Sequence, residues 1–344
     1  MWLSNSSVGR KFIMALTGAF LVLFVTFHCL MNAVAICCPA AYNTVCEFLG
    51  ANWYALVGTA VIAVFVILHI IYAVMLTLQN RKARGHERYS INKRPAGVEW
   101  SSQNMLVLGL VILAFLVVHM IQFWAKMQLA EVLGEEMVIP GAAGTLFLEE
   151  AFSQPWTLIV YVIGFVALWF HLNHGMWSMF QSVGWNNTNW MPRLKAISCW
   201  WTTIVCGLFL AEAIVFTVNA NRHTYLTNET LRDQYKEMLA NEVAKEMGPQ
   251  GVQLAENIKM APYEQVSMGL RQMESSMAEQ IKQVDSPEGQ QMLKAQPEMA
   301  SQIDDLRKNY KVMENSVKLF DYLEKYDNKP QMNMMMGAPQ HQAN

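Results

Sequence analysis

The sequence predicts an all-α protein, with a bundle of five transmembrane helices followed by a helical extramembrane extension. Hydrophobic residues make up 53% of the 344 residues and charged residues 15%, whereas soluble domains contain roughly 25% charged residues. The charge is also divided unevenly, because residues 1–221 contain 20 charged residues and no Asp, and residues 222–344 contain 32. These observations predict a membrane domain over residues 1–221 and a polar domain over residues 222–344.

Five apolar stretches are long enough to cross about 30 Å of hydrocarbon, which takes about 20 residues. They lie at residues 12–36, 53–78, 103–127, 156–180 and 196–218. The first follows Arg10 and Lys11, as in a signal peptide. Its apolar run is longer than the roughly 7–15 residues of such a segment, and it lacks a clean small-residue cleavage site. It is therefore predicted to stay in the mature chain.

Lysine and arginine predict the orientation. Ten of the eleven in residues 1–221 lie in the N-terminal segment and the second and fourth loops, whereas the first and third loops contain only Lys126. Because such residues stay on the cytoplasmic side, the N-terminus is predicted inside and the extension outside, which in a bacterium means the inner membrane and the periplasm. The basic loop at 81–94 could dock a cytoplasmic partner, although topology alone explains it. The net charge of −2 argues against nucleic acid.

Five of the eight histidines lie inside the apolar stretches: His28, His69, His119, His171 and His174. An ionisable side chain inside a membrane is costly and by default marks a functional site. A lone intramembrane histidine is as easily explained by a hydrogen bond to a neighbouring helix. The depths of these histidines along their helices decide between the two explanations.

The depths predict two stacked pairs. His28 and His119 each lie 16 residues into their helices from the inside, whereas His69 and His171 lie 16 and 15 residues in from the outside. Each is therefore about 24 Å along its helix, and in a span of about 36–38 Å the two levels are about 10–12 Å apart. His28 and His119 form the predicted outer pair, and His69 and His171 the predicted inner pair.

Two imidazoles from different helices are what a six-coordinate b-type haem needs, one on each side of the iron. Zinc takes three or four ligands drawn close together, and each pair offers two. No Cys-x-x-Cys-His motif occurs, which excludes covalently attached c-type haem. The sequence therefore predicts two b haems with the four paired histidines as iron ligands, and a proton relay through histidines is the rival interpretation.

Two further features lie near the predicted ligands. Small residues precede the histidines by about three turns: Thr17, Gly18, Gly58 and Gly109. A flat porphyrin needs such room, although glycine in membrane helices more often serves close helix packing. His174 lies one turn after His171 on the same face, so it could replace His171 as ligand or reach a haem propionate, and depth favours His171.

The four ligand segments resemble the large di-haem cytochrome b subunit of succinate:quinone oxidoreductases, that is, succinate dehydrogenase and quinol:fumarate reductase. The resemblance covers residues 1 to about 221 and rests on four motifs in the family's order, namely 25–32 (VTFHCLMN), 68–72 (LHIIY), 117–124 (VVHMIQFW) and 169–178 (WFHLNHGMWS). It implies outer haem ligands on the first and third helices and inner ligands on the second and fourth. His171 matches the family position better than His174, because His-x-x-x-Gly-hydrophobic-aromatic begins there.

The resemblance implies that the chain is an enzyme subunit that anchors two cytoplasmic partners, an iron–sulfur protein and a flavoprotein with covalent FAD and the dicarboxylate site. Electrons would pass between FAD, the clusters, the two haems and a quinone, as part of a respiratory chain. Most di-haem members of the family use menaquinone, and members often dimerise. Both succinate oxidation and fumarate reduction are compatible, because they use the same parts.

Quinone reduction adds two protons with two electrons, so a carboxylate or imidazole is expected near the ring. Glu47 is the only acidic residue in the first outer loop, and members similar to fumarate reductase have an essential glutamate in this region. Glu47 is therefore the predicted catalytic residue, with Tyr42, Asn43, Trp53 and Lys126 as candidate neighbours.

Two other functions stay open. The cytochrome b subunit of a formate dehydrogenase or hydrogenase also uses intramembrane histidine pairs, although the spacing here does not resemble theirs. A transporter or proton channel could use a histidine relay, but no paired, Gly/Pro-broken helices suggest a substrate site at the midplane. Haem content would separate the transporter from the cytochromes.

The extension at residues 222–344 has a helical composition interrupted by prolines. Helices are predicted around 228–247, 252–283 and 298–327, with the last two long enough for a hairpin, and 331–344 is predicted to be disordered. Its predicted role is an outer cap or a dimer contact.

Overall fold

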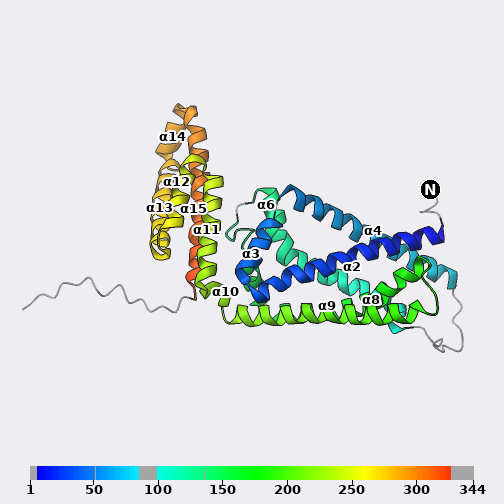
Figure 1. Ribbon diagram of the computed structural model, residues 1–344. Coiled ribbons are helices and arrows are strands. Elements are labelled where there is room, and N and C mark those ends of the chain that lie inside the picture. The colour runs from blue at the N-terminus through cyan, green and yellow to red at the C-terminus, as the bar shows by residue number, and fades with distance from the viewer. Residues whose placement is uncertain (1–5, 51, 85–98, 136, 327–344) are drawn as a thin grey trace, which may run out of the picture. The chain divides into compact units, whose positions relative to one another are not determined.

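The chain folds into two all-helical units, Met1–Arg222 and His223–Asn344 (Figure 1). The computed structural model describes residues 6–50, 52–84, 99–135 and 137–326, and no strand occurs in these ranges. The predicted fold class is confirmed, because unit 1 has five helices long and apolar enough to cross a membrane and more helices follow. Residues 85–94 of the basic loop and the segment 331–344 lie outside the described residues.

All five spanning helices extend beyond the apolar stretches that predicted them. They are α2 (Ser7–Cys37), α4 (Trp53–Arg84), a continuous third span (Trp100–Leu133), α8 (Pro155–Ser182) and α9 (Trp190–Asn221). The third span consists of α5 (Trp100–His119), the π-helix η1 (Met120–Leu129) and α6 (Ala130–Leu133). Two short helices, α3 (Pro39–Phe48) and α7 (Gly144–Phe152), connect the first span to the second and the third to the fourth.

Local sequence explains where several of these helices begin and end. The Ser6 side chain accepts a hydrogen bond from the backbone N–H of Gly9 at 2.9 Å, which caps the start of α2. Pro155 begins α8, where a missing N–H costs nothing. Gly134 follows α6 with a φ of 68°, the left-handed conformation that ends many helices.

Helix α2 is central in unit 1, because it contacts α3, α4, α8 and α9. Figure 1 shows α3 and α6 at the end of the spanning helices opposite the N-terminus. Helix α4 packs mainly on α2 and exposes a row of aliphatic side chains, which are Val57, Val61, Val64, Ile67 and Ile71. Such an apolar exterior suits lipid, while the backbone hydrogen bonds are satisfied within each helix.

Unit 2 is a helical bundle with its own core. Its helices are α10 (Thr224–Thr227), α11 (Glu229–Glu246), α12 (Gly248–Met260), α13 (Tyr263–Val284), α14 (Pro287–Ala295), η2 (Pro297–Met299) and α15 (Ala300–Glu324). Helix α11 packs on α12, and α13 packs on α15 as in the predicted hairpin. The single helix predicted at 252–283 is wrong, because the chain breaks at Pro262 between α12 and α13. A proline disfavours helical geometry in the residue before it.

Candidate functional site

The outer pair joins α2 to the third span. The ring centroids of His28 and His119 are 5.7 Å apart, and the two rings are nearly perpendicular at 87°. Aromatic rings surround them, from Phe24, Phe115, Phe123 and Phe209. Depth along the helices predicted these two partners, and the structure brings them together.

The inner pair joins α4 to α8. The ring centroids of His69 and His171 are 6.2 Å apart, with an angle of 63° between the rings. These histidines are also the partners predicted from depth. The structure thus contains two facing imidazole pairs from four helices, the arrangement that two bis-histidine haems require.

The ring spacings can be compared with the geometry of metal ligation. Imidazole nitrogens bind a metal ion at about 2.0–2.1 Å and lie roughly 1.1 Å from their ring centroid, so two imidazoles on opposite sides of one ion have centroids about 6.3 Å apart. The inner pair, at 6.2 Å, has this spacing. The outer pair, at 5.7 Å, is shorter by about 0.6 Å. Separations of about 4.5–7 Å also occur between ordinary packed aromatic rings, so the spacing of both pairs is compatible with a shared metal ion and with packing alone.

Hydrogen bonding determines which nitrogen of His69 carries the proton. The hydroxyl of Thr17, which is buried, lies 3.0 and 3.1 Å from the backbone carbonyl oxygens of Ile13 and Met14. When the single Thr17 proton goes to one of these carbonyls, Thr17 Oγ1 accepts from His69 Nδ1, which lies 3.3 Å away. The proton of His69 is then on Nδ1, and Nε2 keeps the lone pair that an iron ligand needs.

His28 and His171 lack such an arrangement. Nδ1 of His171 is buried and has no hydrogen-bond partner among the described residues. A buried polar atom without a partner calls for a group outside the protein chain or a bound water. The Asn32 amide nitrogen lies 3.4 Å from His28 Nε2 and donates a shorter bond, 2.8 Å, to the His28 carbonyl. The unpartnered atom of His171 is thus Nδ1, whereas on His28 the Asn32 amide approaches Nε2, the nitrogen that an iron ion would take.

Two glycines lie beside the inner pair. A Cβ atom on Gly18 would lie 3.7 Å from His69 Cε1, and a Cβ atom on Gly109 would lie 3.9 Å from His171 Cε1. Each glycine therefore brings helix backbone up to the edge of an inner-pair ring. A Cβ on Gly58, the third small residue considered from the sequence, would have nothing within 4 Å. The donor set, the ring spacing and the two glycines together fit a haem.

His174 lies towards the C-terminal end of α8 and takes part in a different contact. Its Nδ1 is 3.2 Å from a Glu99 carboxylate oxygen, and Lys195 Nζ is 2.9 Å from the other oxygen. Burial raises the pKa of Glu99, but the hydrogen bonds from Lys195 and His174 outweigh it and hold the pKa below its ordinary value. The structure therefore pairs His171, and not His174, with His69. A contact between His174 and a haem propionate stays a prediction.

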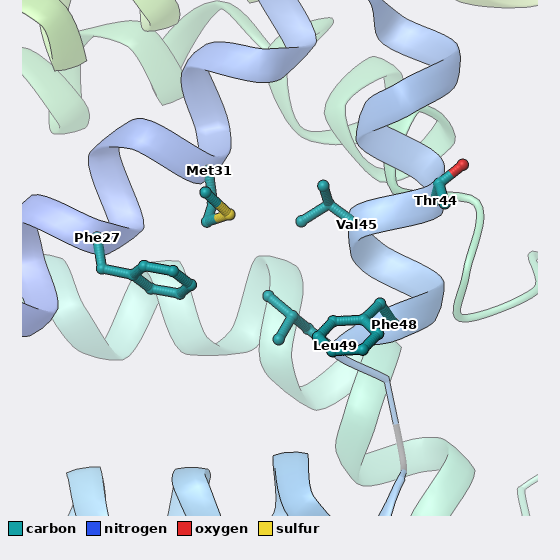
Figure 2. A pocket seen from close by; sticks show the side chains of 6 residues that line it. All are labelled: Phe27, Met31, Thr44, Val45, Phe48 and Leu49. Carbon is teal, nitrogen blue, oxygen red and sulfur yellow. The ribbon is translucent and has the colours of Figure 1, made fainter.

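Glu47, the predicted catalytic residue, lies exposed on α3 at the end of unit 1 opposite the N-terminus. An apolar cleft of about 440 Å³ lies between α2 and α3 (Figure 2). It is lined by Phe27, Met31, Thr44, Val45, Phe48 and Leu49. Phe27 directly precedes the outer ligand candidate His28, and Glu47 directly precedes Phe48. The cleft is open, because Phe27 and Phe48 are 50% and 63% exposed, and its lining is apolar.

The other face of α3 is packed against α7. A Cβ atom on Gly144 would lie 2.8 Å from a ring carbon of Tyr42 and closer still to Cys46 Sγ, so α3 and α7 touch at this glycine. Burial raises the pKa of the Cys46 thiol to about 12. Asn43 is buried and accepts hydrogen bonds from the backbone N–H and hydroxyl of Thr145 at 2.9 and 2.8 Å. This packing fixes the orientation of the cleft-lining face.

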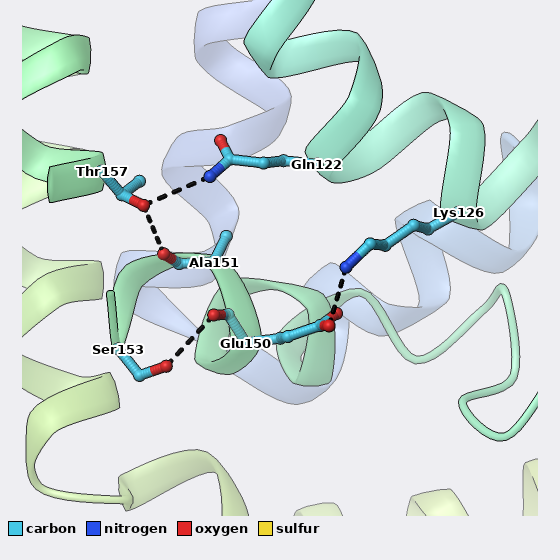
Figure 3. A network of polar contacts seen from close by, with 6 residues as sticks. All are labelled: Gln122, Lys126, Glu150, Ala151, Ser153 and Thr157. Carbon is cyan, nitrogen blue, oxygen red and sulfur yellow. Dashed lines mark hydrogen bonds and ion pairs between the residues drawn. The ribbon is translucent and has the colours of Figure 1, made fainter. Parts of the chain in front are cut away.

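The remaining neighbours predicted for Glu47 are separated. Tyr42 donates to the Asn32 side chain at 3.3 Å, which connects α3 to the outer pair. Trp53 is 76% exposed at the start of α4. Lys126 forms an ion pair with Glu150 of α7 at 2.7 Å (Figure 3). Asn43 and Lys126 are thus engaged with α7, so the structure assigns both of them structural contacts.

Sequence reasoning missed two buried carboxyl groups and the polar contacts of the ligands. Glu212 is buried inside α9, and Cys29 Sγ lies 3.8 Å from its carboxyl group. Its signal was available, since it is the one acidic residue in the fifth apolar stretch. Glu149 is also buried, on α7. Tyr161, whose hydroxyl lies 3.1 Å from His119 Nδ1, gives no signal in the sequence.

The other histidines and acidic residues form no further metal centre in the described ranges. No group of three or more His, Cys, Asp or Glu side chains there could hold a metal ion. His223 stacks on Tyr326 in unit 2 with centroids 3.5 Å apart, and His86 and His341 lie outside the described residues. The two intramembrane pairs are therefore the candidate cofactor sites.

Comparisons with family models, curated proteins and solved structures found no match to this chain. A functional assignment therefore depends on the chain's own residues and their geometry.

Proposed function

We propose that the chain is a membrane-anchored b-type cytochrome that binds two haems and conducts electrons in a complex of the succinate dehydrogenase and fumarate reductase kind. The observation that supports this most is that four spanning helices bring four histidines together in two pairs. The ring centroids are 5.7 Å apart in the outer pair and 6.2 Å apart in the inner pair. A single pair could be explained by packing. Two pairs at two levels, each spaced close to the separation for a shared metal ion, favour ligation.

In this proposal His28 and His119 bind the outer haem iron, and His69 and His171 bind the inner one. Haem iron exchanges one electron at a potential set by its axial ligands and their surroundings. The protein holds the His69 proton on Nδ1 through Thr17, which leaves Nε2 free to bind. The aromatic rings around the outer pair give it an apolar surrounding.

We further propose that the cleft between α2 and α3 binds the quinone ring, with menaquinone as the favoured type from the family resemblance. Its lining is apolar apart from Thr44, which suits a hydrophobic ring. Because the adjacent Glu47 is exposed, its carboxylate can exchange protons with the aqueous phase and pass them to the ring. A proton-exchanging group is what two-electron quinone chemistry needs at its site.

The partners and location are proposed from the resemblance and from the charge distribution. The cytoplasmic partners are a flavoprotein with FAD and an iron–sulfur protein, and they dock on the basic inner side of unit 1. The membrane is the bacterial inner membrane, with the N-terminus in the cytoplasm and unit 2 in the periplasm. Unit 2 acts as an outer cap or a contact between two copies of the complex.

Haem stoichiometry tests the central proposal. A pyridine haemochrome assay with reduced-minus-oxidised spectra on the purified membrane protein should give two b haems per chain. His28→Ala and His119→Ala should remove one haem, and His69→Ala and His171→Ala the other. His174→Ala should keep both haems if His171 is the ligand, and so distinguishes the two histidines of α8. A wild-type protein without haem would contradict the proposal and favour a histidine-relay transporter.

A separate measurement tests the quinone site and the partners. Purification in mild detergent should recover the flavoprotein and iron–sulfur subunits, whereas a molybdenum- or nickel-containing partner would indicate a formate dehydrogenase or hydrogenase instead. Glu47→Gln should lower quinone-linked turnover by about 10²–10⁴-fold, the usual contribution of a general acid–base group. Turnover with a dye that accepts electrons from the soluble partners should persist. Glu135→Gln, another exposed glutamate of an outer loop, should leave both activities unchanged.

A further inference from the structure

The histidine of the third span contacts a buried tyrosine. His119 Nδ1 lies 3.1 Å from the hydroxyl of Tyr161 on α8. The Tyr161 side chain is only 4% exposed and is held by aromatic contacts with Phe115, Phe152 and Phe165. A tyrosine hydroxyl can either donate or accept, so this contact alone does not say which His119 nitrogen has the proton.

The next residues of the network fix the direction of every bond. The Thr157 hydroxyl lies 2.6 Å from the backbone carbonyl oxygen of Ala151 (Figure 3). A carbonyl can only accept, so the one Thr157 proton is used in this bond. Thr157 must then accept from the other neighbour of its oxygen, which is the Gln122 side chain at 3.2 Å. This requirement turns the amide nitrogen of Gln122 towards Thr157.

The orientation of Gln122 decides the rest. With its nitrogen on Thr157, its amide oxygen faces Tyr161 and accepts the phenolic proton at 3.0 Å. Tyr161 then has no proton left for His119 and must accept one from Nδ1. Nε2 of His119 is consequently the nitrogen with a free lone pair. This conclusion follows from the Ala151 carbonyl and does not depend on an assumed amide orientation.

We propose that Tyr161, Gln122 and Thr157 are positioning residues, which hold His119 as the Nδ1-protonated tautomer and so present Nε2 to the haem iron of the outer pair. The proposal rests on the proposed function, because it takes His119 to be an iron ligand. Partners of this kind fix the ring and raise the basicity of the ligating nitrogen. A more basic ligand favours the oxidised iron, so these residues lower the potential of the outer haem.

The local backbone supports a functional role for this network. His119 is the last residue of α5, and Gln122 lies in the π-helix η1 that begins at the next residue. π-helical turns are rare and occur frequently at functional sites. The change from α-helix to π-helix therefore falls between His119, the proposed ligand, and Gln122, which orients the Tyr161 hydroxyl.

The inner pair provides a comparison within the same molecule. His69 reaches the same tautomer through Thr17 alone, whose proton goes to its own helix backbone. The outer pair instead needs three side chains from two segments. Substitutions in one arrangement should therefore alter one haem and leave the other unchanged.

Three variants test the proposal, with the potentials and the low-spin ferric electron paramagnetic resonance spectra of the two haems as readouts. Thr157→Val keeps the side-chain volume and removes the hydroxyl, and Thr157→Ser keeps the hydroxyl and removes a methyl group. Tyr161→Phe removes the acceptor on His119 directly. The signals are assigned to the two haems with the histidine variants described above.

Thr157→Val and Tyr161→Phe are expected to raise the potential of the outer haem, change its resonance spectrum and weaken its binding by about 10–100-fold, as loss of such a partner usually does. A tenfold loss of preference for the oxidised iron corresponds to about 59 mV for one electron. Thr157→Ser should match the wild type. Thr17→Val should shift only the inner haem. In each variant the unaffected haem reports that the bundle has folded.

Two results would overturn the proposal while leaving the proposed function intact. One is a wild-type protein with two haems whose outer potential and spectrum do not change in Thr157→Val or Tyr161→Phe. The other is a shift in Thr157→Ser as large as that in Thr157→Val, which would assign the effect to packing of the methyl group. Absence of haem from the wild type would instead contradict the proposed function itself.

Discussion

Gly164 on α8 lies against the Phe115 ring of α5, and Gly164→Ala is expected to disturb the outer pair. A Cβ atom at this position would lie 2.5, 2.7 and 3.0 Å from three ring carbons of Phe115. Favourable carbon–carbon contacts begin at about 3.5 Å, so the Phe115 ring must move by about 1 Å. That ring already contacts His119, Tyr161 and Phe165, with centroids 5.9, 5.0 and 5.7 Å away. It has little freedom to move.

The expected cost follows from this overpacking. Inserting a methyl group into a filled core costs about 1–3 kcal/mol, and a domain of about 220 residues loses roughly 2–4 °C in Tm per kcal/mol. Gly164→Ala should therefore melt roughly 2–12 °C below its control. The matched control is Gly175→Ala on the same helix, where a Cβ would have nothing within 4 Å. That variant should be neutral or slightly stabilising, because alanine favours helix over glycine.

Circular dichroism during heating in detergent, at one fixed scan rate, measures the difference. Membrane proteins often unfold irreversibly, so only variants scanned identically are comparable. Adding Phe115→Leu to Gly164→Ala should recover part of the loss, because the clashing ring is gone. Equal melting of Gly164→Ala and Gly175→Ala, or strictly additive effects in the double variant, would refute the reasoning.

Two further predictions concern buried and exposed charges. In unit 2, Arg232 is buried and donates to the carbonyls of Leu226 and Leu323 at 2.6 and 2.8 Å, so Arg232→Ala should destabilise this unit by about 3 kcal/mol. Arg271→Ala, which removes exposed ion pairs, should cost less than about 1 kcal/mol. Urea titration followed by limited proteolysis compares the stability of the two variants. Equal losses of stability in both variants would contradict the prediction. The pKa of Glu99 is lowered in the folded protein, so its contribution to stability is present above the ordinary glutamate pKa of about 4.3 and is lost as the pH falls through the lowered value. The Tm advantage of the wild type over Glu99→Gln should therefore be constant near neutral pH and shrink below about pH 4, and an advantage that grows on acidification would show that the sign is wrong.

The five spans were predictable because a run of about 20 apolar residues is a local property of the sequence, and its length alone decides whether a helix can cross the hydrocarbon. The partners of the histidines were predictable for a related reason. A helix rises by a fixed amount per residue, so counting from a membrane surface converts a sequence position into a depth. His28 could therefore be matched to His119, and His69 to His171, without knowledge of how the helices pack.

The polar contacts of the ligands were not predictable in this way. Tyr161, Gln122 and Thr157 are ordinary residues in composition and spacing, and only the packing of α8 and α7 against the third span aligns them with His119. Glu212 was missed for a different reason, because its position in an apolar stretch was visible in the sequence. The break at Pro262 was visible as well, and a continuous helix was wrongly preferred there.

The sequence by itself determined that this protein is helical and membrane-spanning, and which histidines share a level. These properties depend on distance along one axis, which hydrophobic length and helical rise define. Only the tertiary structure decided that the rings lie side by side, that Thr17 and Tyr161 contact Nδ1 of His69 and His119, and that a cleft opens beside Phe27. Those features depend on the rotation of each helix and on hydrogen-bond direction, and both are set by contacts between segments far apart in the chain.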